Sequence, residues 1–377
     1  MKAKSKSGTN PHLEYIAKIA SAFGQNELLL RFYLQAIARD LLPRERVAEC
    51  MRVIAPFQSN VEIRKATDSK RAHYRNLVIC SRLWQCPVCA ATITEQRRRE
   101  LTEALSRSHY FPVLITYTLR HKKADKLTDL LSALLSAFRA YKSGRAWQSF
   151  TSEYSWIGSV RSLEVTYAKN GWHPHIHELA LLEIPITPGI ENGISLFIKK
   201  RWQAVIRKQE YDATWERGAD VRTEDHAIRE YVAKFGRLPE ATNWTVEHEL
   251  VKAPSKRGKI GGSTPMQLLI DYGEGDTAAG RLFIEYSSAF KGRNQLVWSR
   301  GLRALLNITD ELTDEQIAEN AAQSGEILAT ITRQQWREIL KAKCRAELLV
   351  IAANVPQEAL LEYIADIIDT SEAKTGV

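Results

Sequence analysis

The sequence predicts an α+β protein in which an antiparallel β-sheet is flanked by helices. The stretch at 162–182, SLEVTYAKNGWHPHIHELALL, has the turn signal and the strand-forming residues of a β-hairpin. The run FPVLITYTL at 111–119 is apolar and rich in β-branched residues, which is typical of a buried strand. Segments before and after these two carry apolar residues at helical spacing. We therefore expect the strands to form a sheet and the helices to cover it.

The turn of the predicted hairpin is placed at Asn170-Gly171. This dipeptide is the strongest short signal for a two-residue hairpin loop, because a type I′ turn needs positive φ at both central positions. With this loop, Lys169 pairs with Trp172. A loop with an odd number of residues would break the pairing that follows from it.

On this register, Glu164 lies opposite His177 and Thr166 lies opposite His175. Paired residues share a face of the sheet, and so do residues two apart on one strand. One carboxylate and two imidazoles then meet, which is the outline of a site for Mg²⁺ or Mn²⁺. Two histidines in this spacing are by themselves more often an exposed polar face, and the opposing acid favours a metal. His173 shares the face, and its position just past the turn favours a supporting role.

The triplet His175-Ile176-His177 resembles the His-hydrophobic-His motif of the HUH endonucleases. The longer string GWHPHIH at 171–177 resembles the rolling-circle replication initiators of plasmids, which use a single tyrosine. The resemblance implies an HUH-type antiparallel sheet as the core of the protein. It also implies two further motifs, one on a central strand and one on a helix.

Both further motifs occur in the expected order. The strand at 111–119, followed by Arg120, resembles the first motif, and in such proteins this strand packs beside the histidine strand. The segment at 224–235, EDHAIREYVAKF, predicts a helix. Its YVAK string matches the family's Tyr-x-x-Lys motif, which implies Tyr231 as the nucleophile and Lys234 as its electrostatic partner. Taken alone, Tyr231 borders an apolar helix face and would be a core residue.

One position departs from the pattern of the resembling proteins. Some of them carry a carboxylate one helical turn before the tyrosine, where it activates water when replication ends. That position is Ala227 in this sequence. Glu224 lies two turns back on roughly the same helix face, and we expect it to substitute for the missing carboxylate.

Four of the five cysteines lie between residues 50 and 89. The string from Cys86 to Cys89 is half of a structural Zn²⁺ site, because a tight turn brings two thiolates to one tetrahedral centre. Cys80 and Cys50 complete the predicted set, and several initiators of the resembling family look similar in this segment. A redox pair is the alternative, although no thioredoxin-like pattern surrounds these residues. Cys344 is isolated and is read as an ordinary thiol.

The net charge of +9 is unevenly distributed. Residues 301–377 hold 7 basic and 13 acidic side chains, so residues 1–300 carry a net charge of +15. A basic body of this kind favours a polyanionic partner. The chain has no run of about 18 apolar residues, and its N-terminus lacks an apolar stretch. We therefore expect neither a membrane span nor a secretory signal, and a cytoplasmic location.

Two basic segments follow the catalytic motifs. KAPSKRGKIGG at 252–262 and KGRNQLVWSRGLR at 291–303 suit contact with phosphates and packing against bases or sugars. A flexible surface loop is an equally good reading of the first segment. Together with Arg120, the predicted DNA-binding residues are Lys256, Arg257, Lys259, Lys291, Arg293 and Trp298.

Helices are expected in most of the remaining segments. The basic run Arg97-Arg98-Arg99 on one of them is either a solvated face or a phosphate contact. Residues 310–369 are acidic and amphipathic, and they predict a helical bundle for packing or for a protein partner. The expected helical segments are a pair within 13–49, then 95–106, 126–147, 194–209, and one that Thr264-Pro265 opens.

The predicted organisation has four parts. They are a basic arm with helices at 1–49, a zinc-binding segment at 50–105, an endonuclease and DNA-binding core at 106–305, and an acidic helical region at 306–377. The resemblance implies nicking and rejoining of single-stranded or hairpin DNA at a plasmid origin, with a host helicase and polymerase as partners. The alternatives are a transposase or relaxase with the same chemistry, or a zinc-dependent DNA-binding regulator without catalysis.

Overall fold

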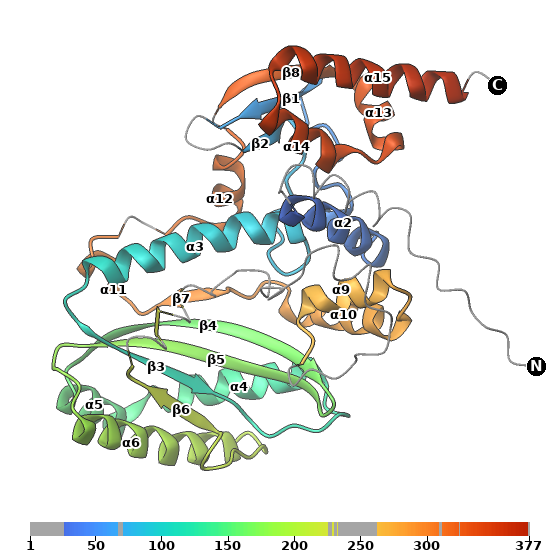
Figure 1. Cartoon of the computed structure of the whole chain (residues 1–377). Coiled ribbons are helices and arrows are strands. Elements are labelled where there is room, and N and C mark those ends of the chain that lie inside the picture. The colour runs from blue at the N-terminus through green and yellow to red at the C-terminus, as the bar shows by residue number, and fades with distance from the viewer. Residues whose placement is uncertain are drawn as a thin grey trace, which may run out of the picture. The chain divides into compact units, whose positions relative to one another are not determined.

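The structure is a computed structural model (Figure 1). It describes residues 26–66, 71–224, 228, 229, 232, 262–308, 311–323 and 325–375. The chain divides into two compact units, each built from segments that are distant in sequence. Unit 1 comprises the described parts of Met1–Ile93 and Leu312–Val377, and unit 2 those of Thr94–Arg237 and Ile260–Glu311. The four-part organisation derived from the sequence remains a prediction.

Unit 2 contains the predicted antiparallel sheet. Its five strands lie in the order β6-β3-β5-β4-β7, and every neighbouring pair is antiparallel. The predicted strand at 111–119 is β3, and it pairs with the histidine strand β5, as the resemblance implied. The strands are β3 (Phe111–Tyr117), β4 (Trp156–Ala168), β5 (Gly171–Leu182), β6 (Ala219–Arg222) and β7 (Leu296–Trp298).

Three helices cover one face of this sheet (Figure 1): α4 (Leu127–Tyr141), α5 (Gly144–Glu153) and α6 (Pro188–Arg207). The helix predicted over 126–147 is in fact two helices. The chain leaves the first helix after Tyr141 and re-enters a helix at Gly144, whose φ of 80° lies in the left-handed region. Only glycine adopts this conformation without a steric cost, which explains why the two helices are separated next to Gly144.

A buried ion pair lies under these helices. The side chain of Glu178, on β5, is fully buried. It pairs with the Nζ of Lys142 and accepts a hydrogen bond of 2.9 Å from the hydroxyl of Tyr117. Lys142 also donates to Ser159 at 2.7 Å. A buried carboxylate needs such partners, because an unpaired buried charge is strongly destabilising.

The other face of the sheet packs a second hydrophobic cluster. Leu179 and Leu181 of β5 contribute to it, together with Leu101 from helix α3 (Pro87–Arg107). Ile228 and Val232 are buried in the same cluster. The described part of unit 2 also contains α9 (Pro265–Gly273) and α10 (Thr277–Phe290), and the short α11 (Leu302–Leu305) follows β7. Thr264 caps α9 and Pro265 is its first residue, as predicted.

Unit 1 has its own three-stranded sheet, in the order β2-β1-β8. Strand β8 lies inside the acidic segment for which only helices were predicted. It pairs with β1 from the other end of the chain, and Ile331 of β8 and Val61 of β1 are both buried. The elements are α2 (Asn26–Leu41), β1 (Asn60–Lys65), β2 (Ala72–Arg75), α12 (Asp314–Asn320), β8 (Glu326–Thr332), α13 (Arg333–Ala342), α14 (Arg345–Asn354) and α15 (Gln357–Thr375).

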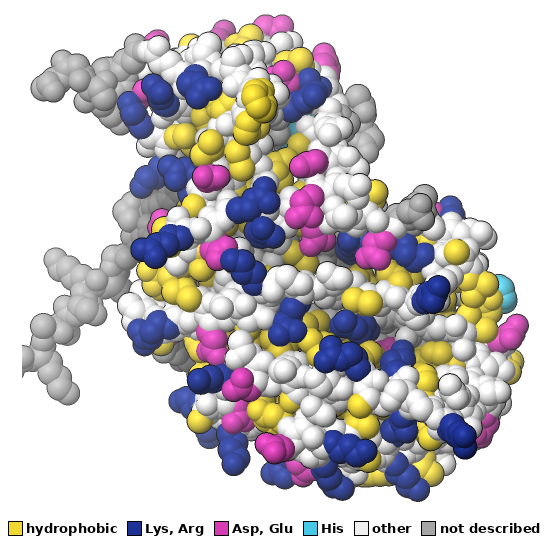
Figure 2. Space-filling model, turned by 180° about the vertical axis from the view of Figure 1, so that it is seen from behind, with side chains coloured by type: hydrophobic (Ala, Val, Ile, Leu, Met, Phe, Trp, Pro, Cys, Tyr) yellow, Lys and Arg dark blue, Asp and Glu magenta, His cyan; other side chains and the backbone are white. Residues whose placement is uncertain are grey.

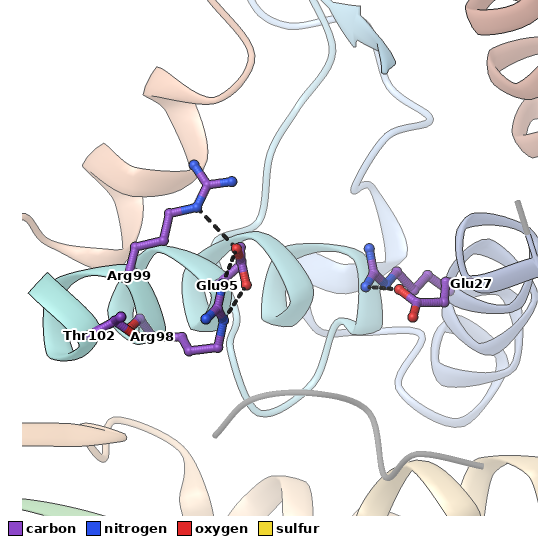
Figure 3. A network of polar contacts seen from close by, with 6 residues as sticks. Glu27, Glu95, Arg98, Arg99 and Thr102 are labelled. Carbon is purple, nitrogen blue, oxygen red and sulfur yellow. Dashed lines mark hydrogen bonds and ion pairs between the residues drawn. The ribbon is translucent and has the colours of Figure 1, made fainter. Parts of the chain in front are cut away.

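The basic run on α3 is paired with acidic side chains, most of them on the same helix. Arg98 and Arg99 both bind Glu95, at 2.8 and 3.0 Å (Figure 3). Arg97 is buried and pairs with Glu100 and Glu311. This run is therefore not a free basic face.

Lys and Arg side chains are spread widely over the surface seen in Figure 2, with fewer Asp and Glu among them. This distribution agrees with the basic net charge of the chain. Within the described residues, no helix is both long enough and apolar enough to cross a membrane.

Candidate metal centres on the sheet and at the cysteine cluster

The hairpin of strands β4 and β5 forms as predicted, but its register differs by two residues. Ala168 pairs with Gly171, so the turn residues are Lys169 and Asn170. Glu164 consequently lies opposite His175, not His177. Because the shift is an even number of residues, the carboxylate and the imidazoles still share one face.

The packing of Gly171 explains why the observed register differs from the predicted one. This residue has a φ of 90°, whereas Lys169 and Asn170 do not have positive φ. A Cβ at position 171 would come within 2.9 Å of the Cα of Lys123. The glycine is therefore needed at the first position of β5, where another loop approaches closely, and the turn itself precedes it.

Glu164, His175 and His177 form a compact cluster on β4 and β5. The Oε2 atom of Glu164 lies 3.4 Å from the Nε2 atom of His175 and 3.5 Å from that of His177. Ligand atoms that share one ion at roughly 2.1 Å have separations of this size. The Glu164 side chain is 43 % exposed and the imidazoles 14 % and 17 %, so the cluster is open on the carboxylate side.

The remaining ring nitrogen of each histidine already has a partner. The Nδ1 atom of His177 lies 2.9 Å from the hydroxyl of Thr116 on β3. The Nδ1 atom of His175 lies 3.2 Å from the backbone carbonyl of His173, which can only accept a hydrogen bond. Both imidazoles thus point Nε2 towards Glu164. Such fixed outer contacts are typical of histidines that ligate a metal.

The electrostatics of the cluster favour an ionised carboxylate. Partial removal of water by the surrounding residues raises the pKa of Glu164, but the hydrogen bonds and charges of His175 and His177 outweigh this effect, and the pKa lies below its ordinary value. Burial, together with the charges of the neighbouring His175 and His121, lowers the pKa of His173 to about 4. The ring of His173 stacks on that of His121 at a centroid distance of 5.2 Å. His173 is therefore a neutral neighbour of the cluster.

Two polar residues on the same face were not predicted. Asp220 on β6 is the register neighbour of Thr116, which places it on the side of the sheet that carries the histidines. Arg222 binds Asp220 at 2.8 Å. The string ADVR that forms β6 is too short for a strand signal, and nothing in the sequence indicated its place in the sheet.

The predicted nucleophile Tyr231 and its partner Lys234 lie outside the described residues, as does Ala227. Ile228 and Val232, which lie close to Tyr231 in sequence, are buried on the sheet face that carries the histidines. Glu224, predicted to activate water, is exposed at the end of the described stretch. The predicted contacts Lys256, Arg257 and Lys259 also lie outside the described residues.

The four predicted cysteines meet in unit 1. Cys89 lies 3.6 Å from both Cys50 and Cys80, measured between Sγ atoms, and Cys86 lies 3.8 Å from Cys50. A tetrahedral centre with Zn–S bonds of about 2.3 Å has edges of roughly 3.8 Å. All four side chains are buried. The cluster could therefore hold a metal ion.

The thiol of Cys86 has the surroundings of a thiolate. Burial raises its pKa, but hydrogen bonds from the other three thiols outweigh this and hold the pKa well below the usual range. The Nε2 atom of Gln35 donates to its sulfur at 3.3 Å. Cys86 also directly precedes the first residue of α3, and a helix N-terminus stabilises negative charge. Four clustered thiols with one stabilised anion suit a cation.

Comparison with known proteins gives the family. A family model described as a replication protein, Rep_1, matches residues 71–343. The chain belongs to this replication protein family. The matched range includes Glu164, His175 and His177, and it confirms the resemblance to plasmid replication initiators.

Two curated proteins are similar to this replication protein. "Protein rep" of Streptomyces lividans is 27 % identical, and the match covers 70 % of this chain and 73 % of that protein. "Neomycin resistance protein" of Streptomyces cyanogenus is 31 % identical over 134 residues, which is 28 % of this chain and 31 % of that protein. No solved structure matches the chain.

The predicted DNA contacts that the structure describes differ in exposure. Arg120 and Lys291 of this replication protein are exposed, and Arg293 is half-buried with its Nε donating to the carbonyl of Ala289. Trp298 is only 9 % exposed and packs in the hydrophobic cluster of unit 2, with Arg303 over its ring at 5.1 Å. Trp298 is thus a core residue, because its strand β7 turns the ring inward.

Proposed function

We propose that this replication protein starts plasmid replication by nicking one strand of origin DNA with Tyr231. The observation that carries the proposal is the Glu164, His175 and His177 cluster, whose three ligand atoms converge while both Nδ1 atoms are held by other groups. A carboxylate with two imidazoles suits Mg²⁺ or Mn²⁺. A bound ion of this kind would polarise the scissile phosphate and stabilise the charge that grows on it.

The protein's own residues supply the bond-making groups. The phenolic oxygen of Tyr231 attacks the phosphorus and forms a 5′-phosphotyrosine link, while the bond to the 3′ oxygen breaks. That oxygen takes up a proton and becomes a free 3′-OH for a polymerase. A tyrosine has an ordinary pKa near 10, so Lys234 helps by favouring the phenolate. The reverse reaction rejoins the strand, because the covalent link retains the energy of the phosphodiester.

The cysteine cluster has a structural role in this proposal. We propose that Cys50, Cys80, Cys86 and Cys89 bind Zn²⁺, with the amide of Gln35 supporting the Cys86 sulfur. Closed four-thiolate sites stabilise folds and leave no position for a substrate. Exposed Arg120 and Lys291 are proposed phosphate contacts, and Glu224 is proposed to activate water at termination. A host helicase and polymerase are proposed partners.

Covalent trapping on DNA tests the proposal. Wild type, Tyr231→Phe and His177→Ala are incubated with labelled single-stranded circular and hairpin DNAs, with Mn²⁺ or with EDTA, and separated on a denaturing gel. We expect an adduct that needs Mn²⁺ and is absent from both variants. Tyr154→Phe is a matched control, because Tyr154 caps α5 on the opposite face of the sheet.

Two results would count against this proposal. An adduct that persists in Tyr231→Phe would assign the nucleophile to another residue. Salt-sensitive binding of DNA without any adduct would instead favour the DNA-binding regulator without catalysis. A transposase or relaxase would give the same adduct and differ only in the DNA that is cut.

A further inference from the structure

A fully exposed phenylalanine stands on a turn in unit 1. Phe57 has a relative accessibility of 105 %, so its ring contacts almost nothing in the protein. Its φ is 65°, in the left-handed region that a bulky side chain rarely adopts. The residue therefore has an unfavourable backbone conformation and no packing that would offset it. Such a combination points to a role outside folding.

The turn that carries Phe57 is held rigidly. The amide of Gln58 donates to the carbonyl of Ala55 at 3.1 Å, with Pro56 and Phe57 between them. A turn with proline at its second position and a residue of left-handed conformation at its third position is a type II turn. The third position of such a turn normally holds Gly or Asn. The amide of Ala55 also donates to the carbonyl of Asn76 at 2.8 Å.

Side chains from the C-terminal helices fasten the same loop. The indole of Trp336 donates to the carbonyl of Arg52 at 2.7 Å, and Arg333 donates to the carbonyl of Gln58 at 3.3 Å. Arg345 donates to the carbonyl of Met51. The exposed ring is thus displayed on a preorganised loop, which lowers the entropy lost when a ligand binds.

Exposed arginines lie on this loop and on helix α13, whose Arg333 and Trp336 bind the loop. Arg52 is exposed, and so are Arg333 and Arg337, which are one helical turn apart on α13. Successive turns place them about 6 Å apart along the helix, so each can contact a separate phosphate. Lys341 continues the row one turn further and binds Glu338, whose carboxylate is buried. The row stands inside a segment whose net charge is negative.

We propose that Arg52, Phe57, Arg333 and Arg337 form a second DNA-binding surface, here named the Phe57 surface. The arginines bind phosphates, and the ring of Phe57 stacks on an unpaired base of single-stranded DNA. An exposed aromatic ring among cations suits this ligand, because stacking needs an accessible base face and the backbone needs positive charge. The proposal rests on the proposed function only in taking DNA as the partner, since its residues all belong to unit 1 and the nuclease residues belong to unit 2.

Binding of oligonucleotides by the full chain tests the surface. Fluorescence anisotropy in EDTA is measured with a labelled oligothymidine and with a duplex of equal length, at several salt concentrations. Phe57→Asn keeps a residue that tolerates the left-handed turn and removes the ring. We expect it to weaken single-strand binding about tenfold and duplex binding little. Phe57→Trp should keep the affinity, and Arg337→Ala should reduce the salt slope by about 0.7.

The controls separate this surface from general effects. Leu361→Asn changes another exposed apolar residue of unit 1, and Arg145→Ala removes an exposed arginine of unit 2. Neither should change single-strand binding. The melting temperature of Phe57→Asn should be no lower than that of wild type, which excludes misfolding as the cause of weaker binding.

Two outcomes would overturn the proposal. Phe57→Asn could bind the oligothymidine as tightly as wild type does. Alternatively, it could change the oligomeric state in sedimentation without changing DNA affinity, which would make the surface a protein interface. The nuclease proposal fails differently: wild type would then form no covalent adduct, whereas binding that depends on Phe57 would persist in Tyr231→Phe.

Discussion

Thr116 and His177 face each other on strands β3 and β5, with the threonine Oγ1 2.9 Å from the histidine Nδ1. This contact holds the imidazole with Nε2 turned towards Glu164. Thr116→Val removes the hydroxyl at almost constant volume. We expect Mn²⁺ affinity, measured by titration calorimetry, to fall about 10- to 100-fold, because outer contacts of this kind orient the ligand.

Thr116→Ser keeps a hydroxyl and should retain most of the affinity. Thr118→Val is a matched control, because the Thr118 hydroxyl donates to the carbonyl of Arg217 and not to a histidine. If Thr116→Val bound Mn²⁺ as wild type does, the contact would have no part in metal binding.

Removal of one cysteine should release the metal of unit 1. The Sγ atom of Cys89 lies 3.6 Å from those of Cys50 and Cys80. We expect wild type to hold one Zn²⁺ per chain and Cys89→Ser to hold none, with a lower melting temperature, because structural zinc contributes directly to folding. Mass spectrometry of the metal content and thermal unfolding measure both effects.

Cys344→Ser is the control for that experiment. Cys344 is also buried, but its Sγ lies 3.7 Å from the carbonyl of Ile339 and not in the cluster. This variant should keep its zinc. Equal loss of zinc from both variants would contradict the assignment of the site.

A side chain at position 171 is predicted to destabilise the protein. Gly171→Ala would place a Cβ 2.9 Å from the backbone of Lys123, at a φ of 90°. We expect a loss of about 1–3 kcal/mol in the free energy of unfolding, measured with urea. Gly292→Ala is the comparison: its φ is also positive, but nothing lies within 4 Å of the added Cβ. A larger effect at Gly292 would show that backbone conformation, and not close packing, determines the cost.

The Glu95 network of α3 predicts a pH dependence of stability (Figure 3). Hydrogen bonds from Arg98 outweigh burial and, with Arg99, hold the pKa of Glu95 at about 2. A lowered carboxyl pKa contributes stability that is present above the ordinary pKa near 4.5 and is lost as the pH falls towards 2. Because the side chain is 36 % exposed, solvent screening limits the contribution to about 1 kcal/mol or less.

Glu95→Gln tests this dependence by urea unfolding at several pH values. The difference between wild type and the variant should be constant at neutral pH and shrink below pH 4.5. Glu103→Gln is a comparison on the same helix, where Arg107 makes a more exposed ion pair. A difference that grew as the pH fell would contradict the assigned pKa shift.

Much of unit 2 could be predicted because local patterns determine it. The apolar run of β3, the alternation along β4 and β5, and the Thr264-Pro265 start of α9 all depend on residues close together in sequence. The predicted register was wrong by two residues, but the sheet face of each side chain was still predicted correctly, because an even shift keeps every side chain on its face. The four cysteines were predictable from composition and spacing, and they meet at buried sulfur separations.

Other features depend on contacts between distant segments. The register of the hairpin follows from the close approach of Lys123 to Gly171, which no pattern within the hairpin reveals. Strand β8 forms because β1, from the other end of the chain, supplies its hydrogen-bond partners. A strand gains its stability from its neighbours, so a segment that is acidic and helix-like in sequence can still join a sheet.

The sequence by itself therefore determined the chemistry of this protein: which carboxylate, imidazoles and thiols are present, and which of them share a face. The tertiary structure decided their distances and their outer partners, such as Thr116 for His177. It also decided that Trp298 is buried and that Phe57 is exposed. Spacing along the chain limits which side chains can meet, but only packing across the fold decides which of them do.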